Sequence, residues 1–187
     1  TTTIPVDLPE DGFGGYVGSH GYASHTPVSD GARVYCFFGK GGVVAFDLEG
    51  QQLWRASVGK ESHSRQWGSG ASPILYKDIV IVNASDESQS IRAFDKKTGQ
   101  EVWKVEGIGP HPSYGTPTLV PRKDQGADLV LAISGEVRGF HPESGKPHWF
   151  AKTNLAGSVC ASVVSDGQTL FVYGGADGRG SLALRAG

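Results

Sequence analysis

The stretch Ile91–Trp103, IRAFDKKTGQEVW, decides the fold of this chain because its pattern occurs three times. An apolar run leads into a turn that contains a glycine, and a tryptophan follows the glycine by four residues. The preceding copy, VVAFDLEGQQLW, ends at Trp54, and the following copy, VRGFHPESGKPHW, ends at Trp149. Successive tryptophans are therefore 49 and 46 residues apart.

A second landmark precedes each copy and has the same period. It is a hydroxyl residue followed by proline at Thr26, Ser72 and Thr116, and a weaker match begins at Ser162. Two independent landmarks with a period in the mid-forties indicate a repeat protein. A repeat of about 40–50 residues that holds four strands is typical of a β-propeller blade.

Each period contains recognisable strands. A short first strand is expected at 73–76, and apolar runs at 34–38, 79–82, 129–133 and 170–173 predict second strands that are buried on both faces. Third strands should end at Phe46, Phe94, Phe140 and near Leu184, and the fourth strand should carry the tryptophan. No segment has a sustained helical stripe. The sequence thus predicts an all-β propeller of four-stranded antiparallel blades, with about four blades present.

The repeat also divides the chain. Residues 1–24 are expected to form an outer strand and a lead-in loop, followed by blades at 25–70, 71–114 and 115–160 and an incomplete blade at 161–187. Residues 2–8 are the expected outer strand. Three arrangements are compatible with one strand at the start and three at the end: a closed four-bladed ring, half of an intermolecular eight-bladed ring, or a piece of a larger, seven- or eight-bladed propeller. The last is favoured because the chain does not start with methionine and its repeat stops in the middle of a blade.

Structural roles are expected for the residues at fixed places in the repeat. Tryptophans at one place in each blade should pack between neighbouring blades, and the aspartates and glycines of the turn should shape it. These structural residues are Trp54, Trp103, Trp149, Asp47, Asp95, Gly50, Gly99 and Gly145.

The candidate binding residues lie in the loops that join one blade to the next. The loops 18–25, 62–70 and 111–115 are rich in polar aromatic side chains and should lie on one face beside the channel. Imidazole and guanidinium groups there are suited to an anionic or planar ligand. The candidates are His20, His25, His63, Arg65, Trp67, His111 and Tyr114. The alternative is that these groups bind loop backbone and line a wet, empty channel.

Composition excludes several function classes. The net charge of −2 provides no positive electrostatic field to attract nucleic acid. No apolar stretch has the roughly 20 residues needed to span a bilayer. Cys36 and Cys160 belong to no metal or haem pattern and are expected to be unpaired. No histidines have close metal-ligand spacing, and no Ser-His-Asp or paired-carboxylate signature is present. Neither a catalytic residue nor a metal ligand is therefore assigned.

Residues 93–103 match the repeat A-x-D-x-x-T-G-x-x-x-W and resemble the pyrroloquinoline-quinone (PQQ)-like propeller family, the quinoprotein alcohol dehydrogenase-like propellers. The same family includes the non-enzymatic lipoprotein that scaffolds β-barrel insertion in the outer membrane. The resemblance extends over the chain after Thr26, although the first copy is one residue shorter and His141 and Ser144 replace the motif residues in the third. It implies export to the periplasm or cell surface.

The resemblance also implies two functions. The family's enzymes hold PQQ with calcium beside a vicinal cysteine pair, and this sequence has no adjacent cysteines and only an isolated acidic pair, Asp86 and Glu87, in a hairpin loop. We therefore expect no cofactor in this chain and a non-catalytic scaffold that binds a protein or small ligand at the loop face, with a homodimer through exposed blade edges as a further expectation. The alternative is a PQQ-dependent dehydrogenase domain whose cofactor anchors lie outside this chain.

Overall fold

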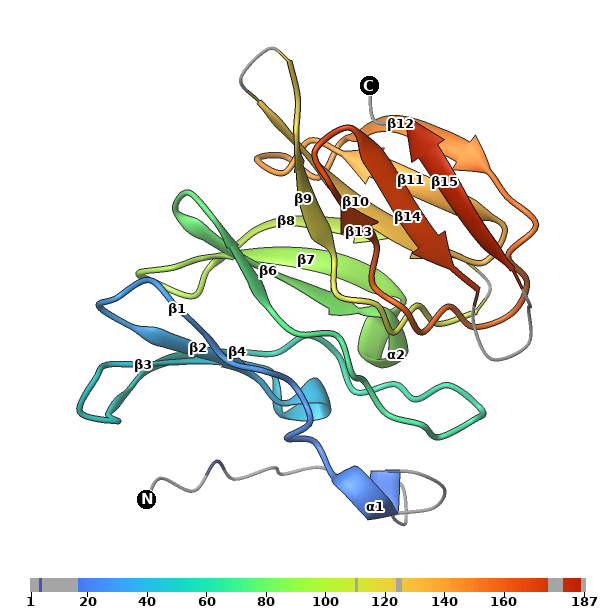
Figure 1. Ribbon diagram of the computed structural model, residues 1–187. Helices are drawn as coiled ribbons and strands as arrows, with labels where there is room; N and C mark the ends of the chain where they lie inside the picture. The colour runs from blue at the N-terminus through green and yellow to red at the C-terminus, as the bar shows by residue number, and fades with distance from the viewer. Residues whose placement is uncertain (1–3, 5–16, 110, 124–125, 175–179, 186–187) are drawn as a thin grey trace.

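The computed structural model describes residue 4 and residues 17–185, apart from 110, 124–125 and 175–179. Its strands form four antiparallel sheets that follow one another along the chain, as Figure 1 shows from blue to red. The first two blades comprise β1 (Val28–Ser29), β2 (Val34–Phe37), β3 (Val43–Phe46), β4 (Gln52–Ala56), β5 (Ile74–Tyr76), β6 (Ile79–Ala84), β7 (Ser90–Asp95) and β8 (Glu101–Glu106). The other two comprise β9 (Thr118–Pro121), β10 (Ala127–Ile133), β11 (Glu136–Phe140), β12 (Pro147–Lys152), β13 (Val164–Ser165), β14 (Thr169–Tyr173) and β15 (Ser181–Arg185).

Each sheet is a simple meander, so the all-β, propeller-type fold expected from the repeat is confirmed. Three sheets have four strands, and the described residues of the fourth blade form three. The short helices are α1 (Val17–His20), η1 (Gly39–Gly41) between β2 and β3, and α2 (Ser85–Ser88) between β6 and β7. The outer strand expected at residues 2–8 lies outside the described residues, except for residue 4.

The third and fourth strands of the first three blades share one irregular register. Trp54 faces Ala45, Trp103 faces Ala93 and Trp149 faces Gly139, and in each blade the register shifts immediately after that pair. A bulge at a fixed place twists the outer strand in the same way in each blade. The small residue opposite the tryptophan is therefore a structural part of the repeat.

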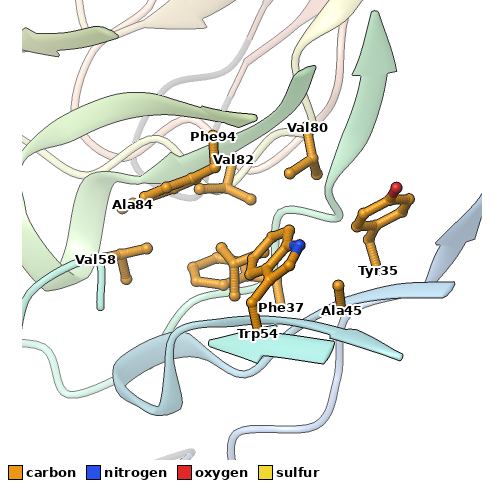
Figure 2. Packing of buried hydrophobic residues seen from close by; sticks show 10 residues of the cluster. Tyr35, Phe37, Ala45, Trp54, Val58, Val80, Val82, Ala84 and Phe94 are labelled. Atoms are coloured by element: carbon orange, nitrogen blue, oxygen red, sulfur yellow. The ribbon is translucent and has the colours of Figure 1, made fainter. Parts of the chain in front are cut away.

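Apolar side chains join each blade to the next. In Figure 2, Tyr35, Phe37 and Trp54 of the first blade pack against Val82 and Phe94 of the second. Equivalent clusters join the second blade to the third and the third to the fourth. Among the described residues, no apolar cluster joins the fourth blade to the first, so a closed four-bladed ring has no support from packing in this part of the chain.

The repeated tryptophan docks on the turn of the following blade. Trp54 Nε1 donates to the carbonyl of Lys96 at 2.9 Å, and a Cβ built on Gly99 would lie only 2.6 Å from the Trp54 indole. Trp103 makes the same contact with the carbonyl of Pro142. Glycine is thus required at residue 99 for two reasons. Its φ is +73°, and the indole of the preceding blade lies against it.

Trp149 behaves differently. Its Nε1 donates to Asp128 Oδ2 at 2.7 Å within its own blade, and its indole covers Gly139, where a Cβ would lie 2.3 Å away. Glycine in place of the alanine of the other blades leaves room for this conformation. Asp128 also accepts from His148 Nδ1 at 2.8 Å, which satisfies a buried carboxylate.

The second sequence landmark has a structural role that the sequence did not show. The backbone N–H of Thr26 donates to Ser72 Oγ, that of Ser72 to Thr116 Oγ1, and that of Thr116 to Ser162 Oγ, each at 2.9 Å. Each hydroxyl therefore accepts from the equivalent residue of the preceding blade. A hydroxyl residue recurs at this place because it satisfies a backbone donor where consecutive blades meet.

We expect Gly99→Ala to destabilise the fold more than Gly50→Ala. Both glycines have positive φ, but a Cβ on Gly50 meets no atom within 4 Å, whereas one on Gly99 meets Trp54. Backbone strain should cost each variant about 1–2 kcal/mol, and overpacking should cost Gly99→Ala about 1–3 kcal/mol more. Urea unfolding of both variants measures the difference, and equal losses would show that the tryptophan contact contributes nothing.

Candidate functional site

The loop between the first and second blades lies against the segment that precedes the first blade. His20 Nε2 donates to the carbonyl of Trp67 at 2.7 Å, and Ser24 Oγ lies 2.7 Å from the other ring nitrogen of His20. His25 Nε2 lies 2.9 Å from Ser69 Oγ. Two histidines therefore hold these segments together.

Aromatic contacts join the same loop to the loop between the second and third blades. The Arg65 guanidinium lies over the Trp67 ring at 4.9 Å, and the ring centroids of Trp67 and Tyr114 are 5.5 Å apart. The rings of His63 and His111 lie edge to face at 6.4 Å. The structure thus brings side chains from all three predicted loops into one continuous region, here called the loop face: residues 18–25, 62–70 and 111–115.

The predicted site residues differ in how accessible they are on this face. His20 and His111 are exposed, and His63, Arg65, Trp67 and Tyr114 are half-buried. His25 is buried instead, with its ring 4.5 Å from that of Phe37 and with no partner for Nδ1 among the described residues. Burial, followed by the nearby His20, lowers the pKa of His25 to about 4, so the imidazole is neutral at pH 7.

Burial is also the main cause of the shifted pKa of Tyr114. It raises the pKa of the Tyr114 phenol, with a smaller contribution from the negative field of Asp86. The phenol oxygen is buried and has no hydrogen-bond partner among the described residues. Tyr114 is therefore an uncharged group whose ring contacts Trp67.

A hollow of about 250 Å³ lies between the second and third loops, beside α2. Its lining is mostly polar and includes Ser62, His63, Asp86, Gln89, His111 and Pro112. The Asp86 carboxylate is buried and accepts the His63 backbone N–H at 3.2 Å. The hollow is thus built by backbone and side-chain contacts between α2 and the second loop.

Reasoning from sequence missed two buried polar residues beside the loop face. Asn83 is buried, and its Nδ2 donates to the carbonyls of Ser113 and Gly115 at 2.8 and 3.0 Å, which fixes the third loop. Glu87 is 1% exposed although the sequence places it in a hairpin loop. The signal that could have found them is the position of Asn83, Asp86 and Glu87 at the end of the apolar run 79–82.

The residues on and beside this face do not fit the calcium of the PQQ enzymes. Calcium requires six to eight oxygen ligands, several of them charged. Among the residues that the structure describes, no three His, Cys, Asp or Glu side chains are grouped to hold a metal ion. The two acidic residues of α2 have other roles. Asp86 accepts a loop N–H. Burial raises the pKa of Glu87 to about 8, so this residue is a neutral acid at pH 7.

Comparison with known proteins places the chain in a family. Residues 11–177 match the family model described as outer membrane protein assembly factor BamB. The chain belongs to the BamB family of PQQ-like propellers. The outer membrane protein assembly factor BamB of Burkholderia pseudomallei (strain K96243) is 33% identical over 112 residues, which are 60% of this chain and 25% of that protein.

Solved structures agree on the fold. BamB from Moraxella catarrhalis superposes with a TM-score of 0.59 at 17% identity, over 80% of this chain and 46% of that one. A quinohemoprotein alcohol dehydrogenase from Pseudomonas putida HK5 superposes with a TM-score of 0.60 at 17% identity, over 80% of this chain and 28% of that one. The chain spans between a quarter and a half of the length of these BamB-family and quinohemoprotein relatives.

In the part of the chain that the structure describes, no helix has both the length and the apolar character needed to cross a membrane.

We expect the stability of the fold to fall in acid because of His25. Its pKa is about 4 in the fold, against 6.5 for a free imidazole, so its contribution is present above pH 6.5 and is lost as pH falls through 4. The full loss is on the order of 3 kcal/mol. Urea unfolding measures it as the difference between the chain and His25→Gln over this pH range, and parallel pH profiles would contradict the assignment.

Proposed function

We propose that this chain is a non-catalytic propeller scaffold that binds a protein partner through its loop face. The observation that carries the proposal is the continuity of that face. Side chains of three loops are fixed to one another around exposed and half-buried aromatic, basic and polar groups, including Arg65 over Trp67. Tryptophan, tyrosine and arginine are the residues that most often dominate protein interfaces.

The partner belongs to outer-membrane protein assembly. This part of the proposal is supported by the BamB family match and by the Burkholderia relative, both described as outer membrane protein assembly factors. We propose that the chain works in the periplasm, where such a partner is met. The partner class is a component of the assembly machinery or an unfolded β-barrel protein.

The dehydrogenase alternative is weaker. The acidic residues that line the hollow are Glu61 and Asp86, of which Asp86 accepts the His63 N–H, and no calcium ligand set is grouped among the described residues. Titration of the chain with PQQ, followed by absorbance and tryptophan fluorescence, separates the two functions. A scaffold should show no saturable binding, and tight stoichiometric binding would overturn our preference.

The scaffold proposal predicts where the partner can be cross-linked. A photoreactive amino acid at the exposed Ser64 in the second loop should form adducts with an outer-membrane assembly component or a β-barrel protein in cell-envelope extracts. The control position is Leu48, which is 61% exposed in the β3–β4 turn at the opposite end of the first blade. Mass spectrometry identifies the adducts.

The double variant Arg65→Ala/His111→Ala should reduce the Ser64 adduct at least about tenfold. Its urea midpoint should remain close to that of the parent chain, because the two residues are half-buried or exposed. Equal adducts from Ser64 and Leu48, or an adduct that the double variant leaves unchanged, would contradict binding at the loop face.

A further inference from the structure

Glu87 lies at the point where α2 meets the first blade. The residue is 1% exposed, and its Oε2 has no hydrogen-bond partner among the described residues. The other carboxyl oxygen is so close to η1 that a Cβ built on Gly39 would lie 3.0 Å from it, and the same Cβ would lie 3.1 Å from the Tyr22 ring. The carboxyl group is therefore enclosed between α2, η1 and the segment before the first blade.

The groups around this carboxyl do not compensate a negative charge. Ser69 provides a side-chain hydrogen bond, and Lys40 on η1 is a nearby cation, but Asp86 is a nearby anion on α2 itself. His25, on the other side of Ser69, is neutral at pH 7, and Tyr114 is a neutral phenol. Burial and Asp86 outweigh Ser69 and Lys40, and they raise the pKa of Glu87 to about 8.

Residues of α2 also hold the second loop and the segment that leads into it. The carbonyl of Glu87 accepts the Glu61 N–H at 3.0 Å, and Asp86 Oδ1 accepts the His63 N–H at 3.2 Å. Gly59 passes so close to α2 that a Cβ there would lie 2.2 Å from the Glu87 carbonyl oxygen. A displacement of α2 would therefore break contacts to the loop that carries Arg65 and Trp67.

We propose that Glu87 is a proton-sensitive latch that holds the loop face closed as a neutral carboxylic acid and loosens it when the carboxyl group ionises. The neutral acid is tolerated in the enclosed site, whereas a carboxylate needs hydrogen-bond donors or water. Ionisation therefore favours conformations in which α2 and the second loop separate and admit water. No partner is required for this change.

The direction of the pH dependence follows from the linkage between proton binding and folding. A carboxyl group whose pKa is raised by folding contributes stability that is fully present below its unfolded value of 4.5 and is lost as pH rises through about 8. Local opening around α2 should follow the same direction, since the loop contacts depend on the enclosed neutral form. The isosteric variant Glu87→Gln cannot ionise and should remain closed throughout.

Amide hydrogen exchange of Glu61 and His63 tests the latch most directly, with Glu87→Gln compared at each pH. At about pH 6 the two proteins should protect these amides equally, and at about pH 9.5 the parent chain should lose protection by about tenfold relative to the variant. The Gly99 amide, which bonds to the Asp95 carbonyl in the turn at the other end of the blade, should show no such difference. Equal protection of Glu61 and His63 in both proteins at both pH values would overturn the proposal.

Variants of two residues that neighbour Glu87 provide a second test, which does not require Glu87→Gln to fold. Asp86→Asn removes the nearby anion that raises the pKa of Glu87 but keeps an oxygen for the His63 N–H, so the opening midpoint should move to lower pH. Ser69→Ala removes the hydrogen bond that favours the carboxylate, so the midpoint should instead move to higher pH, without any change in charge. A midpoint that neither variant moves would assign the transition to another group.

Discussion

Each blade of this protein is one antiparallel sheet with apolar side chains on both faces, and this makes contact between consecutive blades the constraint on which the structure depends. Strand β6 shows the constraint most clearly, because all six of its residues are buried. A sheet of this kind has no stable solvent-facing side. The docking of Trp54 on Gly99 and of Trp103 on Gly145 therefore does more than fill space, since it sets the position of each turn against the blade before it.

This dependence explains how much of the fold the sequence predicted. The hydroxyl residue recurs because three interfaces repeat its contact, and the tryptophan and the turn glycine recur because Trp54 and Trp103 dock in the same way. Their period alone therefore predicts the blades. The features that could not be predicted are those that do not repeat from blade to blade. Trp149 turns onto its own blade because Gly139 and Asp128 replace the residues found there in other blades, and no repeat pattern announces such a local exchange.

The loop face was predicted in part. Polar aromatic residues between blades indicated the right loops, and the structure joins them through contacts such as Trp67 with Tyr114. Burial could not be predicted from residue type, because His25 and Glu87 are enclosed by segments distant in sequence. The same enclosure makes these two groups neutral at pH 7, and it leaves the charge of the face to groups such as the half-buried Arg65. A face whose loops already contact one another suits a scaffold, since less ordering cost remains when a partner binds.

The central claim, that the tryptophan of one blade rests on the turn of the next, is tested most directly by a double-mutant cycle between Trp54→Ala and Gly99→Ala. With the indole removed, alanine at residue 99 has no ring to meet, and only its positive φ remains unfavourable. The account predicts that Gly99→Ala costs at least about 1 kcal/mol less in the Trp54→Ala background than in the parent chain. Equal costs in the two backgrounds would contradict it.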